Sequence, residues 1–94
     1  MFEDELEVTV SENDLAMLKK ISNPIRMQIV IELSLVDEYS VSELMKILGV
    51  SRSTIAIALM DLRRLNIVAS RPVLQRMYYR LISEKARRVV MALI

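Results

Sequence analysis

The chain has 94 residues, the size of one domain, and it contains neither cysteine nor histidine, which excludes disulfide bonds and the usual thiolate and imidazole ligands of metal sites. Its net charge is only +1, but residues 1–14 carry six acidic side chains and no basic one, whereas residues 46–88 carry ten basic and two acidic ones. Such a local positive field favours a polyanionic partner, although charge alone is equally compatible with a solvated surface.

More than half of the residues are apolar (53%), which exceeds what the thin core of so short a chain needs, so we expect a homodimer that buries part of this surface. The uninterrupted apolar runs are far shorter than the roughly 20 residues of a membrane span, and no leader is visible, which predicts a cytoplasmic protein. We see no nucleophile beside a base and no glycine-rich phosphate loop. We therefore expect no enzymatic activity, no cofactor and no metal.

The predicted elements follow an acidic N-terminal arm, residues 1–10, and form one domain, residues 11–94. Apolar residues recur at helical spacing in five segments and at every second position in one further segment. The pattern therefore predicts a mainly α-helical domain with a small β-hairpin. The helices are expected over residues 14–21, 24–36, 41–48, 52–65 and 84–94, and the hairpin over residues 67–82.

A side chain able to cap a helix precedes each predicted helix, namely Ser11, Asn23, Ser40, Ser51 and Ser83. Glu43 follows Ser40 at the spacing of a capping box, and Gly49 can end the third helix in the left-handed conformation. Because Ser51 follows Gly49 after one residue, a brief turn joins the third and fourth helices. Two helices joined in this way form a helix-turn-helix motif.

In the hairpin, apolar and polar residues alternate from Arg76 to Leu81, which predicts a strand with one buried face. Residues 67–71 are expected to pair with this strand, and residues 72–75 to form the tip. The last helix is amphipathic with an unusually wide apolar face, so we expect it to pack against the first helix of a second copy; covering its own core is the alternative. The predicted dimer contacts are Leu15, Leu18, Val89, Val90 and Leu93.

This order of elements is that of a winged helix-turn-helix, in which the second helix of the pair enters the major groove of DNA. If Ile55, Leu59 and Leu62 face the core, the opposite side of that helix is free to contact bases and phosphates. The predicted DNA contacts are Ser51, Arg52, Ser53, Thr54, Ala56, Ile57, Arg63 and Arg64 on the helix and Arg71 and Arg76 on the wing.

These residue types suit different parts of a duplex. Arg52 can hold guanine through two hydrogen bonds, Ser53 and Thr54 can bind a base or a phosphate, and Ala56 and Ile57 can contact thymine methyl groups. The two arginines at the end of the helix suit phosphates, and those of the wing suit phosphates or the minor groove. For the wing, a solvated hairpin is the alternative.

A second hypothesis comes from two large apolar side chains on the outer face of the same helix. Ile57 and Met60 lower solubility there unless something covers them. A winged helix that binds another protein through these two residues is therefore the alternative to a DNA-binding regulator, because a fold does not determine a function.

From about residue 18 to residue 81 the sequence resembles the ArsR family of dimeric winged-helix repressors, and three stretches carry this resemblance. They are "SNPIRMQIVIEL", "SVSELMKILGVSRSTIAIALMDLRRLNIV" and "MYYRL", the last matching the second strand of the wing. The resemblance implies a dimeric transcriptional regulator, and we expect a repressor. It also implies dimerisation through the first and last helices and DNA reading by the helix that starts at Ser51.

The sequence departs from this family at positions that bear on its effector and its target. Ser40 and Ser42 stand where metal-sensing members carry a cysteine pair, and the last helix offers only Glu84 toward the zinc ligands of other members. Ile57 and Ala58 replace two histidines of the reading helix. The resemblance therefore implies a member without metal sensing and with a target sequence of its own.

Overall fold

The structure, a computed structural model, describes residues 11–94, so the predicted acidic arm, residues 1–10, lies outside the described part. Five helices and a three-stranded antiparallel sheet make up these 84 residues, and none of the helices is long and apolar enough to cross a membrane. The elements are α2 (Glu12–Ile21), α3 (Pro24–Leu35), β1 (Tyr39–Ser40), α4 (Val41–Leu48), α5 (Arg52–Arg64), β2 (Val68–Val73), β3 (Arg76–Leu81) and α6 (Glu84–Met91). The predicted winged helix-turn-helix is confirmed.

Local side-chain contacts start the helices where the sequence predicts them. Ser11 Oγ accepts a hydrogen bond from the backbone N–H three residues on (3.0 Å), and Ser83 Oγ does the same at α6 (3.1 Å). Asn23 caps α3 in the same way. Ser40 and Glu43 form the capping box in both directions, at 3.2 and 2.8 Å. Each cap satisfies a backbone N–H that a helix start would leave without a partner.

Some predicted helix bounds differ from the structure by one or two residues. Helix α2 begins at Glu12 because Ser11 is its cap, and α3 ends one residue before Val36, whose backbone is extended (φ −135°, ψ 161°). Helix α5 ends at Arg64, because Leu65 has left the helical conformation (φ −94°, ψ 9°).

The last helix differs more, since it is predicted over residues 84–94 and ends at Met91. The residues after it, Leu93 and Ile94, are exposed, so the described chain covers less than half of either one. With so little packing, the entropy lost in ordering a further helical turn is not offset.

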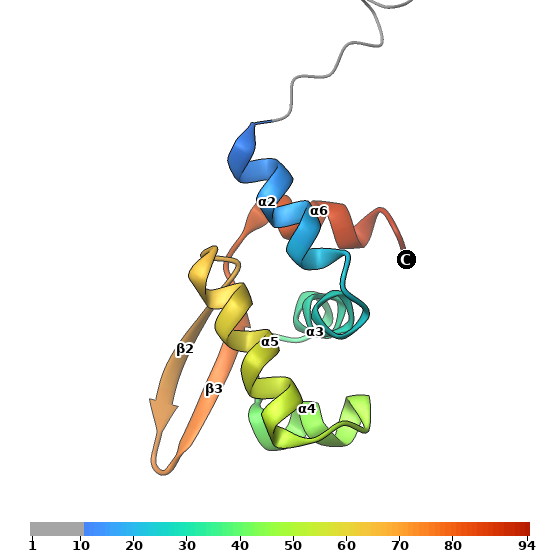
Figure 1. The fold of residues 1–94 in the computed structure, drawn as a ribbon. Coiled ribbons are helices and arrows are strands. Elements are labelled where there is room, and N and C mark those ends of the chain that lie inside the picture. Colours follow the sequence, from blue (N-terminus) through green and yellow to red (C-terminus); the bar gives the residue numbers. More distant parts are fainter. Residues whose placement is uncertain (1–10) are drawn as a thin grey trace, which may run out of the picture.

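The wing is an antiparallel hairpin whose tip is shorter than predicted. Val73 pairs with Arg76, so only Leu74 and Gln75 form the turn, in place of the predicted residues 72–75. The strand continues through Pro72 because β2 lies at the edge of the sheet, in the order β1-β3-β2, where a missing N–H breaks no ladder hydrogen bond. Figure 1 shows the hairpin extending away from the helices as a wing.

The two-residue strand β1 is absent from the sequence prediction. Tyr39 pairs with Tyr79 and Ser40 with Tyr78, so β1 occupies the edge of β3 that the hairpin leaves open. Two residues are too few to show a period of two, and this strand forms only because β3 is already in place.

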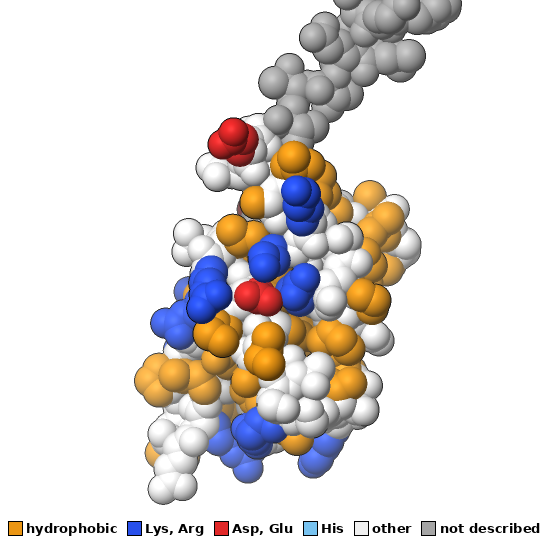
Figure 2. Space-filling view, in the orientation of Figure 1, with side chains coloured by type: hydrophobic (Ala, Val, Ile, Leu, Met, Phe, Trp, Pro, Cys, Tyr) orange, Lys and Arg blue, Asp and Glu red, His pale blue; other side chains and the backbone are white. Residues whose placement is uncertain are grey.

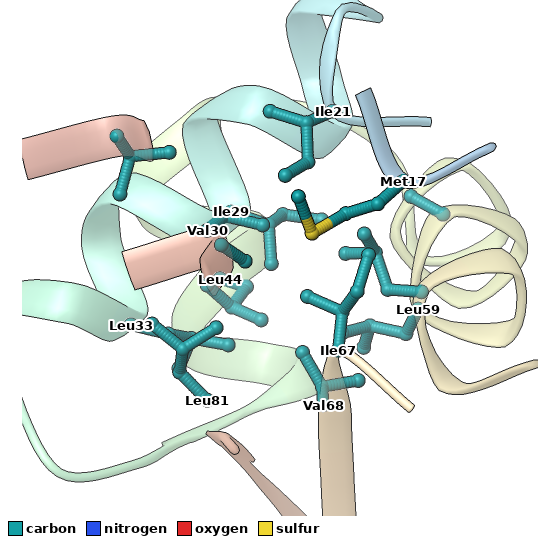
Figure 3. Packing of buried hydrophobic residues seen from close by; sticks show 14 of the residues in the cluster. Met17, Ile21, Ile29, Val30, Leu33, Leu44, Leu59, Ile67, Val68 and Leu81 are labelled. Atoms are coloured by element: carbon teal, nitrogen blue, oxygen red, sulfur yellow. The ribbon is translucent and has the colours of Figure 1, made fainter. Parts of the chain in front are cut away.

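The core lies between α3, α5 and the base of the wing. Figure 3 shows Ile29 and Val30 of α3 packed near Leu44 of α4, Leu59 of α5 and Ile67, which precedes β2. All five side chains are fully or almost fully buried. Burying a large aliphatic side chain contributes roughly 1.5–3 kcal/mol to the stability of the fold. This cluster therefore fixes the position of α5 through its buried side.

Candidate nucleic-acid interface

The turn before α5 sets the direction of that helix. Gly49 adopts the left-handed conformation (φ 69°), and its N–H donates to Met45 O at 2.8 Å, which closes α4. Ser51 then caps α5, accepting from the Thr54 N–H at 3.3 Å and lying 2.9 Å from Thr54 Oγ1. The turn therefore separates α4 and α5 by only three residues and fixes where α5 begins.

One side of α5 faces the core and the other faces solvent, as the sequence predicts. The buried side carries Ile55, Ala58, Leu59 and Leu62. The exposed side carries Arg52, Ser53, Ala56, Ile57, Met60 and Arg63. The exposed fraction is 57% for Ile57 and 48% for Met60, so both large apolar side chains do lie on the outer face.

Arg52, the first residue of α5, lies on the same side of the molecule as the wing tip. Its Nη2 donates to Ser42 Oγ of α4 at 3.0 Å, which holds the guanidinium at the start of α5. Arg52 and Ser42 line one surface hollow together with Gln75, Arg76 and Met77 of the wing. Residues 24 positions apart in sequence thus present two cations to the same space.

The hydroxyl groups at the start of α5 hydrogen-bond to one another. Ser51 Oγ lies 3.1 Å from Ser53 Oγ in addition to its contacts with Thr54. Ser53 is exposed, whereas Thr54 is half-buried. Because the Ser51 hydroxyl already caps the helix, Ser53 is the hydroxyl of this group that is most open to an external partner.

At its C-terminal end α5 carries a cationic cluster with one acid in its middle. Asp61 Oδ2 accepts from Arg26 Nη1 of α3 at 3.1 Å, and both side chains are only 19% exposed. Lys20 of α2 and Arg64 approach the other carboxylate oxygen at 3.8 and 3.9 Å. Figure 2 shows these charges as blue side chains around a red one, where α2 and α5 meet. The ion pair between Asp61 and Arg26 therefore links α5 to α3.

The wing arginines lie in different environments. Arg71 is opposite Tyr78, two residue pairs back from the tip, and its Nε donates to Glu38 Oε2 at 2.9 Å while its Nη2 donates to Glu38 Oε1. These hydrogen bonds lower the pKa of the Glu38 carboxyl, and they raise the pKa of Arg71. Because the strands extend further than predicted, Arg71 lies further from the wing tip than the sequence indicates. Arg76 lies at the tip and is exposed.

Helices α2 and α6 lie near each other, and four of the five predicted dimer contacts lie at or near the surface on these helices and on the residues that follow α6. Leu15, Leu18 and Leu93 are exposed, and Val89 is partly buried against the core. Val90 is 0% exposed within the single chain, so the prediction that it contacts a second copy is wrong. Its side chain fills the chain's own core because α6 packs against α3, an arrangement that sequence periodicity does not reveal.

A lysine joins the same two helices. Lys85 Nζ donates to Asp14 Oδ1, and this hydrogen bond lowers the pKa of the Asp14 carboxyl. The Lys85 side chain is 64% exposed and the Asp14 side chain 30% exposed, so solvent screens the pair, which helps to align α2 with α6 and adds little to stability.

Sequence reasoning does not predict the contacts of Ser42, Glu38 and Asp61 with the proposed DNA-binding arginines Arg52, Arg71 and Arg64. For Asp61 a signal exists, because it is the only acid between Lys46 and Ser83, and a lone acid in a basic segment favours a structural ion pair. For the other two no local signal exists. Their partners lie 10 and 33 positions away.

Comparison with known proteins identifies related regulators. A model of the bacterial regulatory protein, arsR family, matches residues 23–70, just over half of the chain. The biofilm growth-associated repressor of Xylella fastidiosa is 37% identical over 77 residues, which cover 82% of this chain and 67% of that protein.

Solved structures agree in fold. HlyU from Vibrio cholerae N16961 superposes with a TM-score of 0.81 at 32% identity, covering 86% of this chain and 87% of HlyU. The transcriptional repressor BigR from Xylella fastidiosa gives 0.80 at 35% identity, covering 84% and 80%. The chain therefore belongs to the ArsR family of bacterial regulatory proteins, which are DNA-binding transcriptional regulators with a winged helix-turn-helix.

Proposed function

We propose that the protein is a homodimeric repressor that binds double-stranded DNA at a specific sequence. The observation that carries this proposal is the hollow shared by Arg52 and Arg76. A helix start and a wing tip that face the same space can engage one duplex together, the helix in the major groove and the wing beside it. The repressor role is supported by the names of two relatives, and the proposed place of action is the cytoplasm.

In this proposal the outer face of α5 reads bases. Arg52, oriented by Ser42, binds guanine, while Ser53 bonds a base or a phosphate. Ala56 and Ile57 have no hydrogen-bonding group, so the base-edge group that suits them is the thymine methyl. The guanidinium groups of Arg63, Arg64 and Arg76 suit the phosphates of the DNA backbone.

The dimer sets the shape of the target. With α2 and α6 of two copies packed about a twofold axis, the two α5 helices enter successive major grooves about 34 Å apart. The target is then an imperfect palindrome. No metal or cofactor takes part in this proposal.

The first experiment selects bound duplexes from a random pool with the purified protein. We expect a palindrome with guanine and thymine in each half-site. Affinity for the selected duplex should fall steeply with salt, with a log–log slope of roughly −0.9 for each phosphate contact. Failure to bind any duplex, even at low salt, contradicts the proposal and favours a protein partner for Ile57 and Met60.

A pair of arginine variants tests the assigned roles. Arg52→Ala should weaken binding to the selected duplex by roughly tenfold or more, the value of a base contact, and random duplex much less. Arg76→Ala should weaken both duplexes about equally and make the salt dependence shallower. Titrations of each variant with both duplexes measure this, and equal losses for both variants on both duplexes contradict the assignment.

A further inference from the structure

The tip of the wing carries an apolar side chain in an unusual position. Leu74 is 99% exposed, more than any other large hydrophobic residue of the described chain. It is the first residue of the two-residue turn between Val73 and Arg76, and its backbone is left-handed (φ 57°).

A leucine is poorly suited to both features. Its Cβ crowds the backbone when φ is positive, so hairpin turns of two residues normally place glycine or asparagine there. The other two residues with positive φ among residues 11–94 are Gly49 and Asn66, which are both residue types that tolerate this conformation. Among residues 11–94, Leu74 alone combines a strained backbone with a solvated apolar side chain, and no contact with these residues covers the side chain.

The surroundings of Leu74 indicate what it contacts. Its neighbours Gln75 and Arg76 line the hollow that also contains Arg52 at the start of α5. With α5 in a major groove, a wing on the same side of the molecule reaches past the bordering phosphates to the adjoining minor groove. Arg76 supplies the charge that a passage between phosphates requires. An exposed leucine beside such a cation matches the apolar side chains that minor-groove binders insert.

We propose that Leu74 enters the minor groove next to the major groove occupied by α5 and packs there against sugars and base edges. This inference rests on the proposed function and adds a contact to it. It also accounts for the exposed leucine, because contact with the duplex covers an apolar side chain that the described residues leave in solvent.

Three substitutions of Leu74 distinguish its proposed contact with DNA from its effect on the stability of the fold. Leu74→Gly and Leu74→Asn both suit a positive φ and both remove the apolar side chain, whereas Leu74→Met keeps an apolar side chain. For each variant we measure the thermal midpoint of unfolding, the affinity for the selected duplex, and hydroxyl-radical cleavage of the bound duplex, which reports on sugars that line the minor groove.

Stability and affinity should change in opposite directions. The glycine and asparagine variants should unfold at a temperature equal to or above that of the unsubstituted protein, yet bind the duplex roughly tenfold more weakly, the factor expected when a buried leucine side chain is lost. Protection of the minor-groove sugars next to each half-site should disappear. Leu74→Met should keep both affinity and protection.

Two results would overturn the inference in distinguishable ways. Unsubstituted protein that binds no duplex contradicts the proposed function, and the minor-groove contact with it. Unsubstituted protein that binds, together with glycine and asparagine variants of unchanged affinity and footprint, leaves the proposed function standing and refutes the role of Leu74.

Discussion

At the residue scale, a single carboxylate pairs with one of the two wing arginines that we propose as DNA contacts. Glu38 holds Arg71 through hydrogen bonds to two nitrogens of the guanidinium, and planar pairing of this kind is geometrically specific. Arg71 therefore differs from Arg76, which lies at the tip and is exposed. Sequence alone cannot distinguish these two arginines, because the acid that separates them is 33 positions from Arg71.

Releasing Arg71 should strengthen DNA binding. Glu38→Gln removes one negative charge and frees one cation, so we expect affinity for random duplex to rise by roughly fivefold or less and the salt dependence to steepen. Titration at several salt concentrations measures both. The matched control is Glu84→Gln, which removes an equal charge from α6 at an ion pair with Arg87. Equal gains in both variants would show a net-charge effect and contradict a specific role for Glu38.

The Glu38–Arg71 pair also has a defined pH range. Hydrogen bonding to Arg71 lowers the pKa of Glu38, so the folded carboxyl stays ionised below its ordinary range. A lowered pKa stabilises the fold at higher pH, and this contribution disappears as the pH falls through the folded pKa. Between neutral pH and about pH 5 the Glu38 carboxyl should therefore stay ionised and paired with Arg71. The difference in the free energy of unfolding between Glu38→Gln and the unsubstituted protein, measured from unfolding curves, should stay constant over this range.

At the scale of elements, the turn between α4 and α5 depends on one backbone conformation. Gly49 has φ 69°, and a Cβ added there would meet no heavy atom within 4 Å. The cost of a substitution is therefore conformational and not steric contact with neighbours.

Gly49→Ala should lower the free energy of unfolding by about 1 kcal/mol, or the thermal midpoint by roughly 4–8 °C. Gly49→Asn should lower it less, because asparagine tolerates the left-handed region. Urea unfolding of both variants checks this. Asparagine as destabilising as alanine would mean that something other than φ determines the cost.

At the scale of the whole molecule, α2 and the residues that follow α6 form one apolar surface that a single chain leaves uncovered. Leu15, Leu18 and Leu93 are exposed there, whereas Val90, on the same helix as Val89, is already in the core. The proposed twofold pairing buries the exposed leucines and explains why the sequence is more apolar than one small core requires.

Leu18→Glu should convert the proposed dimer to a monomer. A twofold axis places the substitution in the interface twice, so we expect the dimer dissociation constant to rise by roughly a hundredfold or more. Sedimentation at several concentrations measures it. The matched control is Ile57→Glu, an exposed apolar position on the outer face of α5, which should leave the dimer intact and abolish DNA binding. Unchanged assembly of Leu18→Glu would contradict the proposed interface.

The sequence by itself determines the helix starts and the orientation of α5. Ser11, Asn23, Ser40, Ser51 and Ser83 each cap a helix in the structure, because a cap needs only a backbone N–H two or three residues away. The buried side of α5 follows from its 3.6-residue period in the same local way.

Tertiary structure decided the features that join distant segments. Strand β1 forms because β3 has an open edge, and Val90 is buried because α6 packs on α3. Glu38 pairs with Arg71 because Glu38 directly precedes β1, which lies beside the wing. The approach of Arg52 to Arg76 depends on the same packing. A local pattern encodes distances along the chain, whereas these contacts depend on how whole elements are placed against one another around a shared core.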